Sequence, residues 1–220
     1  MSWCGNSLTA YGVFGLWNWQ MRLLLFSDLH SDFRTASKLV ELSSQVDIVV
    51  GAGDFCIGRR GLEKIISALA RIKKPSVLVP GNSESDEELI NACRRWKSAH
   101  VLHGRQVSID GATFFGIGGG IPITPFGSWS YDFSEAEARD LMRDCPSGCI
   151  LISHSPPKGV VDRSSGGRSL GSLAVRETIE RKQPSLVVCG HIHGSAGQAN
   201  RLEETIVINA GPGGIIHDLN

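Results

Sequence analysis

Ser185-Leu186-Val187-Val188-Cys189-Gly190-His191-Ile192-His193 joins a run of aliphatic residues to two closely spaced imidazoles. The apolar run ends at a glycine, which is typical of a short strand buried on both faces. In α/β proteins the carboxyl end of such a strand is where ligands bind. If the chain stays extended beyond Cys189, His191 and His193 face one way and Ile192 faces the other. The segment therefore predicts a strand over residues 185–189 that supplies metal ligands from its carboxyl end.

Side chains suited to metal binding also follow four other apolar runs. They are Asp28 and His30 after residues 23–26, Asp54 after 47–50, Asn82 after 77–79, and His154 after 149–152. Apolar residues at helical spacing predict helices between or beside these runs, over residues 32–44, 62–72, 85–96, 134–144 and 173–182. The alternation predicts parallel strands joined by right-handed crossovers, so that the polar side chains after them gather at one sheet edge.

The pattern changes after the third expected helix. Asp110-Gly111 separates two strand-like runs, 106–109 and 113–117, and predicts a two-residue hairpin. A long loop over 118–132 follows, and we expect its rings Phe126, Trp129 and Tyr131 to pack over the core or form a lid rather than to stack on a substrate. A last strand over 205–208 ends at Asn209, which we expect to support the site as a turn residue.

Charge and cysteine content narrow the class of protein. The 220 residues carry 22 Lys plus Arg and 22 Asp plus Glu, a balance that argues against general nucleic-acid binding or a membrane-surface role. No apolar run reaches the length of a membrane helix. The six cysteines lack a CxxC pair, which indicates reduced thiols and a cytoplasmic protein. Cys145 and Cys149 could also form half of a zinc site, although the sequence has no second Cys or His pair at matching spacing.

The first twenty residues differ from the rest of the chain. They contain Trp3, Trp17 and Trp19 but no Lys or Arg, and glycines interrupt their apolar residues, so they fit neither part of a signal peptide. Met21 opens directly onto the first apolar run. We therefore expect residues 1–20 to be a dispensable N-terminal extension with Met21 as the natural start, and residues 21–220 to form a single domain.

The polar segments at the strand ends form an ordered set, namely Asp28-x-His30, Gly53-Asp54, Gly81-Asn82, Ser153-His154 and Gly190-His191-x-His193. This set resembles the signature of the calcineurin-like metallophosphoesterase family, over residues 21–212. The resemblance implies an α/β fold, a four-layer sandwich in which two packed mixed β-sheets are flanked by α-helices. It also implies a phosphoric ester hydrolase.

The resemblance further implies a site with two divalent ions, for which Mn, Fe and Zn all suit the donors. One ion would be held by Asp28, His30 and His193, the other by Asn82, His154 and His191, and Asp54 would bridge them. Asp54, Asn82 and His154 would be the catalytic residues. A hydroxide held between the ions would attack phosphorus, while the ions spread the charge that develops on the phosphoryl oxygens.

One position departs from the family pattern. Many members carry His directly after the motif Asn, where it is thought to protonate the leaving oxygen, and here that position is Ser83. A hydroxyl cannot supply a proton near neutral pH as an imidazolium can. We therefore expect a preference for phosphodiesters, or for monoesters with good leaving groups, over alkyl monoesters. Glu84, His103 and His217 are candidate replacements for the missing acid.

The sequence also allows other functional interpretations. Arg163 and Arg168 either neutralise a substrate phosphate or lie in a solvated loop, and Ser83 is a further candidate to contact the substrate. The expected function is metal-dependent hydrolysis of a small-molecule phosphodiester or activated phosphomonoester. The alternatives are a phosphoesterase-like interaction module with little or no catalysis, and a dimetal hydrolase of C–N or C–O bonds. Neither the oligomeric state nor the physiological substrate follows from the sequence.

Overall fold

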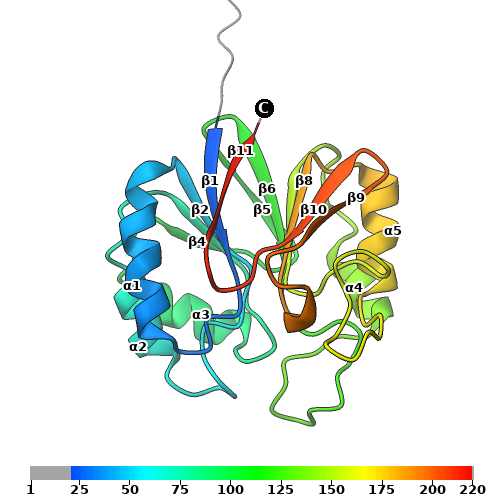
Figure 1. The fold of residues 1–220 in the computed structure, drawn as a ribbon, viewed down its shortest axis with the longest axis horizontal. Coiled ribbons are helices and arrows are strands. Elements are labelled where there is room, and N and C mark those ends of the chain that lie inside the picture. The colour runs from blue at the N-terminus through cyan, green and yellow to red at the C-terminus, as the bar shows by residue number, and fades with distance from the viewer. Residues whose placement is uncertain (1–20, 220) are drawn as a thin grey trace, which may run out of the picture.

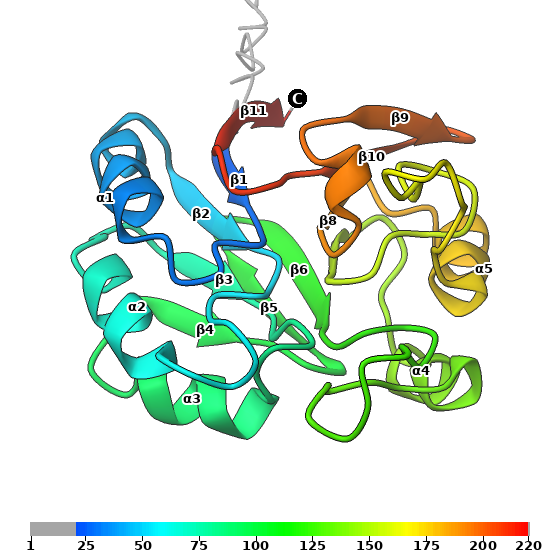
Figure 2. The ribbon, with the colours of Figure 1, turned by 60° about the horizontal axis from the view of Figure 1, so that its bottom comes forward.

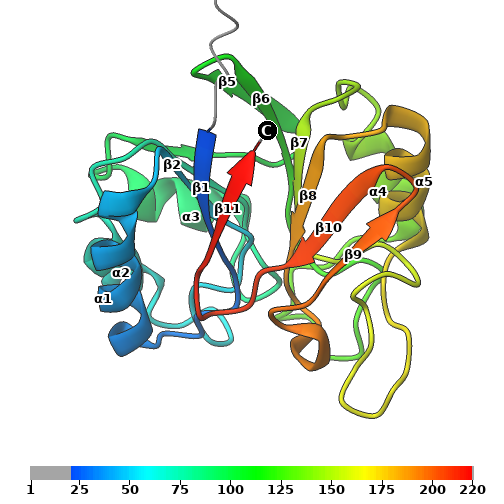
Figure 3. The ribbon, with the colours of Figure 1, turned by 45° about the horizontal axis from the view of Figure 1, so that its top comes forward.

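Two β-sheets pack face to face, with helices on both outer sides (Figure 1). The computed structural model describes residues 21–219, so the expected extension over residues 1–20 lies outside the described residues. The helices α1, α2 and α3 cover one side of the pair of sheets and α4 and α5 cover the other, as both turned views show (Figure 2, Figure 3). The expected four-layer α/β sandwich is confirmed. None of the helices within residues 21–219 combines the length and hydropathy needed to span a membrane.

The first sheet has the strand order β11-β1-β2-β3-β4. Its strands are β1 (Met21–Phe26), β2 (Ile48–Gly51), β3 (Ser76–Leu78), β4 (Ala99–Val101) and β11 (Ile215–Leu219), and only β11 is antiparallel to its neighbour. Its helices are α1 (Phe33–Leu42), followed by the short 3₁₀ helix Ser43–Gln45, α2 (Leu62–Leu69) and α3 (Asp86–Cys93). The side chains of Asp32 and Ser85 cap α1 and α3, because each accepts hydrogen bonds from backbone N–H groups of the first turn.

The second sheet has the order β5-β6-β7-β8-β10-β9. Its strands are β5 (Arg105–Ile109), β6 (Ala112–Ile117), β7 (Ile150–Ser153), β8 (Leu186–Cys189), β9 (Ala199–Leu202) and β10 (Thr205–Asn209). Its helices are α4 (Glu135–Leu141), α5 (Leu173–Lys182) and the 3₁₀ helix His193–Ser195. Asp110 and Gly111 have φ values of 47° and 82°, which is the positive-φ pair that the predicted hairpin between β5 and β6 requires.

Apolar residues fill three layers of core, one between the sheets and one beneath each helical layer. Alternate residues of one strand serve different layers: Leu23 and Leu25 of β1 pack between the sheets, whereas Leu24 and Phe26 pack against the helices. This is why the central strands are apolar on both faces. Both sheets are thereby held so that the carboxyl ends of β1, β2, β7 and β8 meet.

Replacing Leu25 by Ala tests the core between the sheets, because Leu25 has no exposed surface there. We expect Leu25→Ala to lower the free energy of unfolding by about 2–5 kcal/mol, measured by urea denaturation. The matched control is Leu173→Ala, at a side chain that is 49% exposed on α5 and should change the free energy of unfolding by less than about 0.5 kcal/mol. Equal losses in the two variants would contradict this packing.

Candidate metal centre

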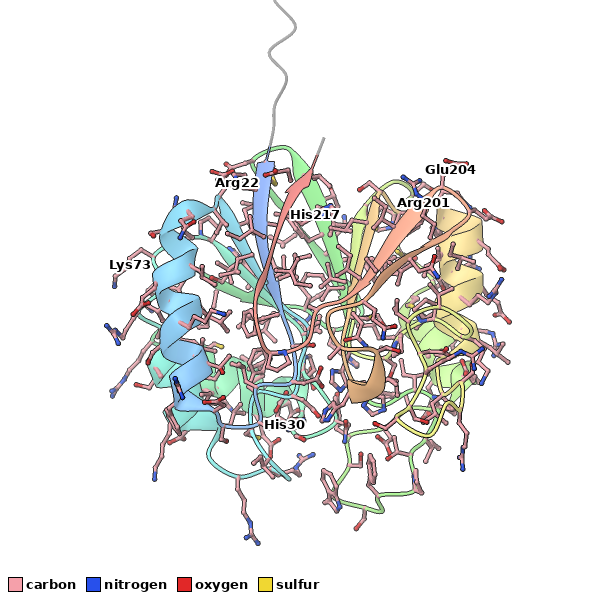
Figure 4. The ribbon with its side chains drawn as sticks, viewed as in Figure 1. Arg22, His30, Lys73, Arg201, Glu204 and His217 are labelled. Atoms are coloured by element: carbon pink, nitrogen blue, oxygen red, sulfur yellow. The ribbon has the colours of Figure 1, made fainter. Side chains whose placement is uncertain are left out.

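Five segments that follow strands bring their polar side chains together where the two sheets meet. Donor atoms of Asp28, His30 and His193 lie within 4.8 Å of one another, and so do those of Asp28, Asp54 and His154. Figure 4 places His30 at the lower end of the molecule, where these segments converge. Residues from both sheets, far apart in the chain, therefore share one site.

The motif glycines are needed because the segments approach each other closely. A Cβ on Gly81 would lie 2.0 Å from Oδ1 of Asp54, and a Cβ on Gly190 would lie 2.5 Å from Oδ2 of Asp28. In each case the carboxylate belongs to a different motif from the glycine. A side chain at either glycine would thus displace a predicted ligand, so the Gly-Asn and Gly-His pairs are a steric requirement of the site.

Backbone strain is concentrated at the predicted ligands. Asp28, His30, Asp54 and His191 have positive φ values of 55°, 45°, 56° and 65°. Residues other than glycine adopt this region rarely, and a cluster of them commonly marks a functional site. The turn at His191 also makes one expectation wrong: the chain is not extended through Ile192, because β8 ends at Cys189 and a 3₁₀ helix begins at His193.

Hydrogen bonds set the orientation of the donors on the His154 side. His154 Nδ1–H donates to Ala52 O at 2.7 Å, so in the neutral ring Nε2 is the acceptor. This Nε2 lies 3.3 Å from Oδ1 of Asn82 and 3.6 Å from Oδ1 of Asp54. Asn82 turns its oxygen to this point because its Nδ2–H donates to Ser130 Oγ at 3.0 Å. With the ring neutral, three acceptor atoms converge at this point, and such a set fits a cation.

The His30 side repeats this arrangement. His30 Nδ1–H donates to Cys56 O at 3.2 Å, so its Nε2 faces His193 Nε2 at 3.1 Å and Oδ2 of Asp54 at 3.6 Å. Asp28 completes the group, with Oδ1 at 3.6 Å from His193 Nε2. The two oxygens of Asp54 therefore face different histidines, as a bridging carboxylate would.

At Asp28 and His191, electrostatics favour the protonation states that metal binding needs, whereas the hydrogen bond to Asp28 raises the pKa of His193. Burial opposes ionisation of Asp28, but hydrogen bonds from His193 and Ser27 and the nearby imidazoles prevail and lower its pKa to about 2. Burial, together with the neighbouring His154, lowers the pKa of His191 to about 4. Near neutral pH the first is a carboxylate and the second a neutral imidazole, and these are the forms that bind metal ions.

Two buried side chains hold the site segments together from behind. Glu84 accepts hydrogen bonds from the backbone N–H groups of Gly81 at 2.7 Å and of Phe55 and Cys56 at 3.3 Å, and so ties the Asp54 loop to the Asn82 loop. Asn209 Nδ2 donates to the carbonyls of Gly190 and Ile192, as its expected supporting role requires.

A cleft of about 590 Å³ opens over the predicted ligands, and its lining shows which candidate substrate residues lie at the site. Ser83 and Arg168 line it. Arg163 does not, because its guanidinium donates to Gly167 O at 2.9 Å within its own loop. The structure therefore brings one of the two arginines to the site.

None of the three candidate acids lines the cleft. Glu84 is fully buried behind the site, where burial and the charge of Asp54 raise its pKa to about 7. His103 accepts from Gly118 N–H and packs against Phe133. His217 lies in β11 at the opposite end of the molecule from His30 (Figure 4). The place of the missing imidazole therefore stays without a replacement among these three.

The cysteines take no part in the centre. Cys145 and Cys149 lie with their Sγ atoms 3.7 Å apart, but neither belongs to a group of three metal-suited donors within residues 21–219. The structure thus gives a zinc half-site there no further ligand. Cys56 is buried and donates to Ser83 O at 3.1 Å, in keeping with its packing role.

Sequence reasoning missed the residues that orient Asn82. Ser130 Oγ–H donates to Oδ1 of Asp132 at 2.7 Å, and Oδ2 of Asp132 accepts from Thr124 N–H at 2.8 Å. Ser130 is thus fixed as the acceptor for the Asn82 amide. No motif signals this, because the three residues lie in a loop without periodicity.

The chain thus combines an α/β sandwich with acceptor atoms that converge at the junction of its two sheets. Residues 21–195 match the profile of the Calcineurin-like phosphoesterase family, and the chain belongs to this family. Seven predicted ligands lie at the ends of strands within or next to the matched region: Asp28, His30, Asp54, Asn82, His154, His191 and His193. Their role in holding metal stays a prediction.

Known proteins resemble the chain at two levels. A UPF0046 protein of Caenorhabditis elegans is 30% identical over 208 residues, covering 85% of this chain and 68% of that protein. TT1561 of Thermus thermophilus has a similar structure, with a TM-score of 0.72, 18% identity and coverage of 91% and 99% of the two chains. A dimetal phosphatase from Danio rerio gives a TM-score of 0.57, 13% identity and coverage of 86% of each chain. At these identities the structural matches establish the fold alone.

Removing the Ser130 hydroxyl tests how Asn82 is oriented. We expect Ser130→Ala to weaken Mn²⁺ binding by about 10-fold, measured by titration calorimetry, since second-shell hydrogen bonds typically contribute this much. Ser108→Ala is the matched control, because Ser108 Oγ bonds only the Thr113 hydroxyl on the β5–β6 hairpin. An unchanged Mn²⁺ affinity in Ser130→Ala would show that Asn82 does not depend on this bond.

Proposed function

We propose that this protein is a metal-dependent hydrolase of small-molecule phosphoesters, either phosphodiesters or activated phosphomonoesters. The observation that carries the proposal is the position of Asp54, whose two carboxylate oxygens face His154 on one side and His30 on the other, each at 3.6 Å. That arrangement suits a carboxylate shared by two cations.

The ions, when bound, would supply Lewis acidity and a water of lowered pKa for attack on phosphorus. Asp28, His30 and His193 would hold one ion, and Asn82, His154 and His191 the other, with Asp54 between them. The chain's remaining contribution is orientation: Ser130 fixes the Asn82 amide and Ala52 O fixes the His154 ring. Arg168, on the lining of the cleft, would neutralise charge on a phosphate there.

An interaction module is the rival from another class, and the donor geometry argues against it. A scaffold would not require acceptor atoms of His154, Asn82 and Asp54 to face each other across 3.3 to 3.6 Å. With His154 neutral, these acceptor atoms repel one another unless a cation lies between them, which supports metal binding. Hydrolysis of a C–N or C–O bond uses similar centres, and no observation on this chain favours it over phosphoester chemistry.

Asp54→Asn tests the proposal with bis-p-nitrophenyl phosphate and Mn²⁺. The amide keeps the shape but lacks the charge that a bridging group supplies, so we expect kcat/KM to fall by at least about 100-fold. Asp47→Asn is the matched control. Asp47 directly precedes β2, the strand that leads to Asp54, but its side chain accepts a hydrogen bond from Arg22 N–H and lies away from the cleft. Full activity in Asp54→Asn would place the reaction elsewhere, and no Mn²⁺-dependent turnover in the parent protein would favour the interaction module.

Ser83 in place of the usual imidazole generates a prediction about leaving groups. Ser83 is buried beside Asp54, to whose Oδ1 its backbone N–H donates at 2.8 Å, and it lines the cleft, whereas Glu84, His103 and His217 do not. General acid catalysis contributes about 10²–10⁴-fold. We therefore expect kcat/KM for an aryl diester to exceed that for an alkyl monoester by at least about 100-fold in parallel assays. Comparable rates would show that another group protonates the leaving oxygen.

A further inference from the structure

The walls of the cleft differ in character from its floor. Eight large hydrophobic side chains are exposed among residues 21–219, and five of them line this one cleft: Ile57, Ile123, Phe126, Trp129 and Leu170. Their exposed fractions run from 38% at Leu170 to 65% at Ile123, so they do not serve the core. Exposed apolar side chains gathered beside a polar site commonly mark a binding surface. We refer to these five as the apolar wall.

Three loops form the apolar wall, and internal hydrogen bonds hold two of them in shape. The 118–132 loop carries three of its members and is closed on itself where Asp132 accepts from Thr124. The 162–172 loop carries Leu170 and is held by Asp162, which accepts from Gly159 and Gly171 N–H at 2.9 Å. The rings of Phe126 and Trp129 stack with centroids 5.8 Å apart and planes at 21°. Contacts within the chain therefore shape the two loops that carry four of the five side chains of the wall.

We infer that the natural substrate is a phosphoester whose organic group is bulky and apolar, and that this group lies on the apolar wall while the phosphate reaches the metal centre. The inference rests on the proposed function and adds the class of substrate to it. The cleft, at about 590 Å³, has the size of a small-molecule site. An apolar organic group that covers the wall removes apolar surface from water, which favours binding. A strongly polar group in the same place would gain less, because it would itself lose contact with water.

A diester series with one leaving group tests the inference by kinetics. Every member is a p-nitrophenyl ester of an alkyl phosphate, so the reactivity stays nearly constant, and the second group is methyl, hexyl or 2-naphthylmethyl. We expect kcat/KM for the hexyl or the naphthylmethyl member to exceed that for the methyl member by at least about tenfold, and which of the two is preferred separates aliphatic from aromatic recognition. Equal kcat/KM across the series would overturn the inference and leave the proposed function standing.

Matched variants locate the selectivity. We expect Phe126→Ala to reduce the preference over the methyl diester at least about threefold. The control is Phe33→Ala, the same change at a residue that is 47% exposed at the start of α1, compared with 51% for Phe126, and that lies outside the cleft. It should keep the preference of the parent protein. A preference that survives in Phe126→Ala and in Trp129→Ala would show that the wall does not bind the organic group.

Binding without turnover separates the two proposals. Phosphinates have only P–C bonds beside their oxygens and cannot be hydrolysed, so 2-naphthyl(methyl)phosphinate and dimethylphosphinate can be compared by calorimetry on the Mn²⁺-loaded protein. We expect the naphthyl compound to bind at least about tenfold tighter, and Phe126→Ala to narrow this ratio. Tighter binding without hydrolysis of any diester would overturn the proposed function alone. Equal affinities for the two phosphinates would overturn the inference.

Discussion

Negative charge buried at the junction of the two sheets is the constraint to which much of the structure responds. Asp28 and Asp54 are only 6% and 4% exposed and share a donor group with His154. Ionised carboxylates are costly to bury unless hydrogen bonds or cations compensate them. Hydrogen bonds serve each in part, from Ser27 and His191 N–H to Asp28 and from Ser83 N–H to Asp54. Divalent ions would complete the compensation, which is the physical reason for reading the site as a metal centre.

The fold followed from the sequence where apolar runs are long and buried on both faces. The central strands β1, β2, β7 and β8 were predicted to within one or two residues of their observed bounds. The strands that sequence reasoning missed are β4, β9 and β11, and all three lie at sheet edges. Ala99–Val101 is only three residues long, and Ala199–Leu202 has a polar, exposed face, so neither shows a run or an alternation. Their pairing is decided by tertiary contacts that local patterning does not encode.

The residues of the candidate site also fall into two groups, those that a local sequence pattern predicts and those that only tertiary contacts reveal. The candidate ligands could be predicted because each follows a recognisable strand, and at Gly81 and Gly190 a Cβ would collide with a carboxylate of another motif. Glu84 acts by accepting hydrogen bonds from the backbone, and Ser130 acts through the side chain of Asn82. Their residue types therefore do not indicate a role in the site. The sequence does not distinguish Arg163 from Arg168 as a phosphate-binding residue. The hydrogen bond of the Arg163 guanidinium to Gly167 O, seen only in the structure, distinguishes them. The turn at His191 was missed because a strand was assumed to continue.

One loop links the metal centre to the surface that would select a substrate. Residues 118–132 supply Phe126 and Trp129 to the apolar wall, and through Ser130 they fix the amide of Asn82. Tyr131 N–H also donates to Asn82 O at 2.9 Å, so this predicted ligand is tied to the loop by backbone and side chain alike. The predicted ligands themselves follow the ends of strands whose apolar side chains pack between the two sheets. Substrate preference can therefore change with the loop while the motifs stay fixed, and for that reason membership of the family does not by itself define the substrate.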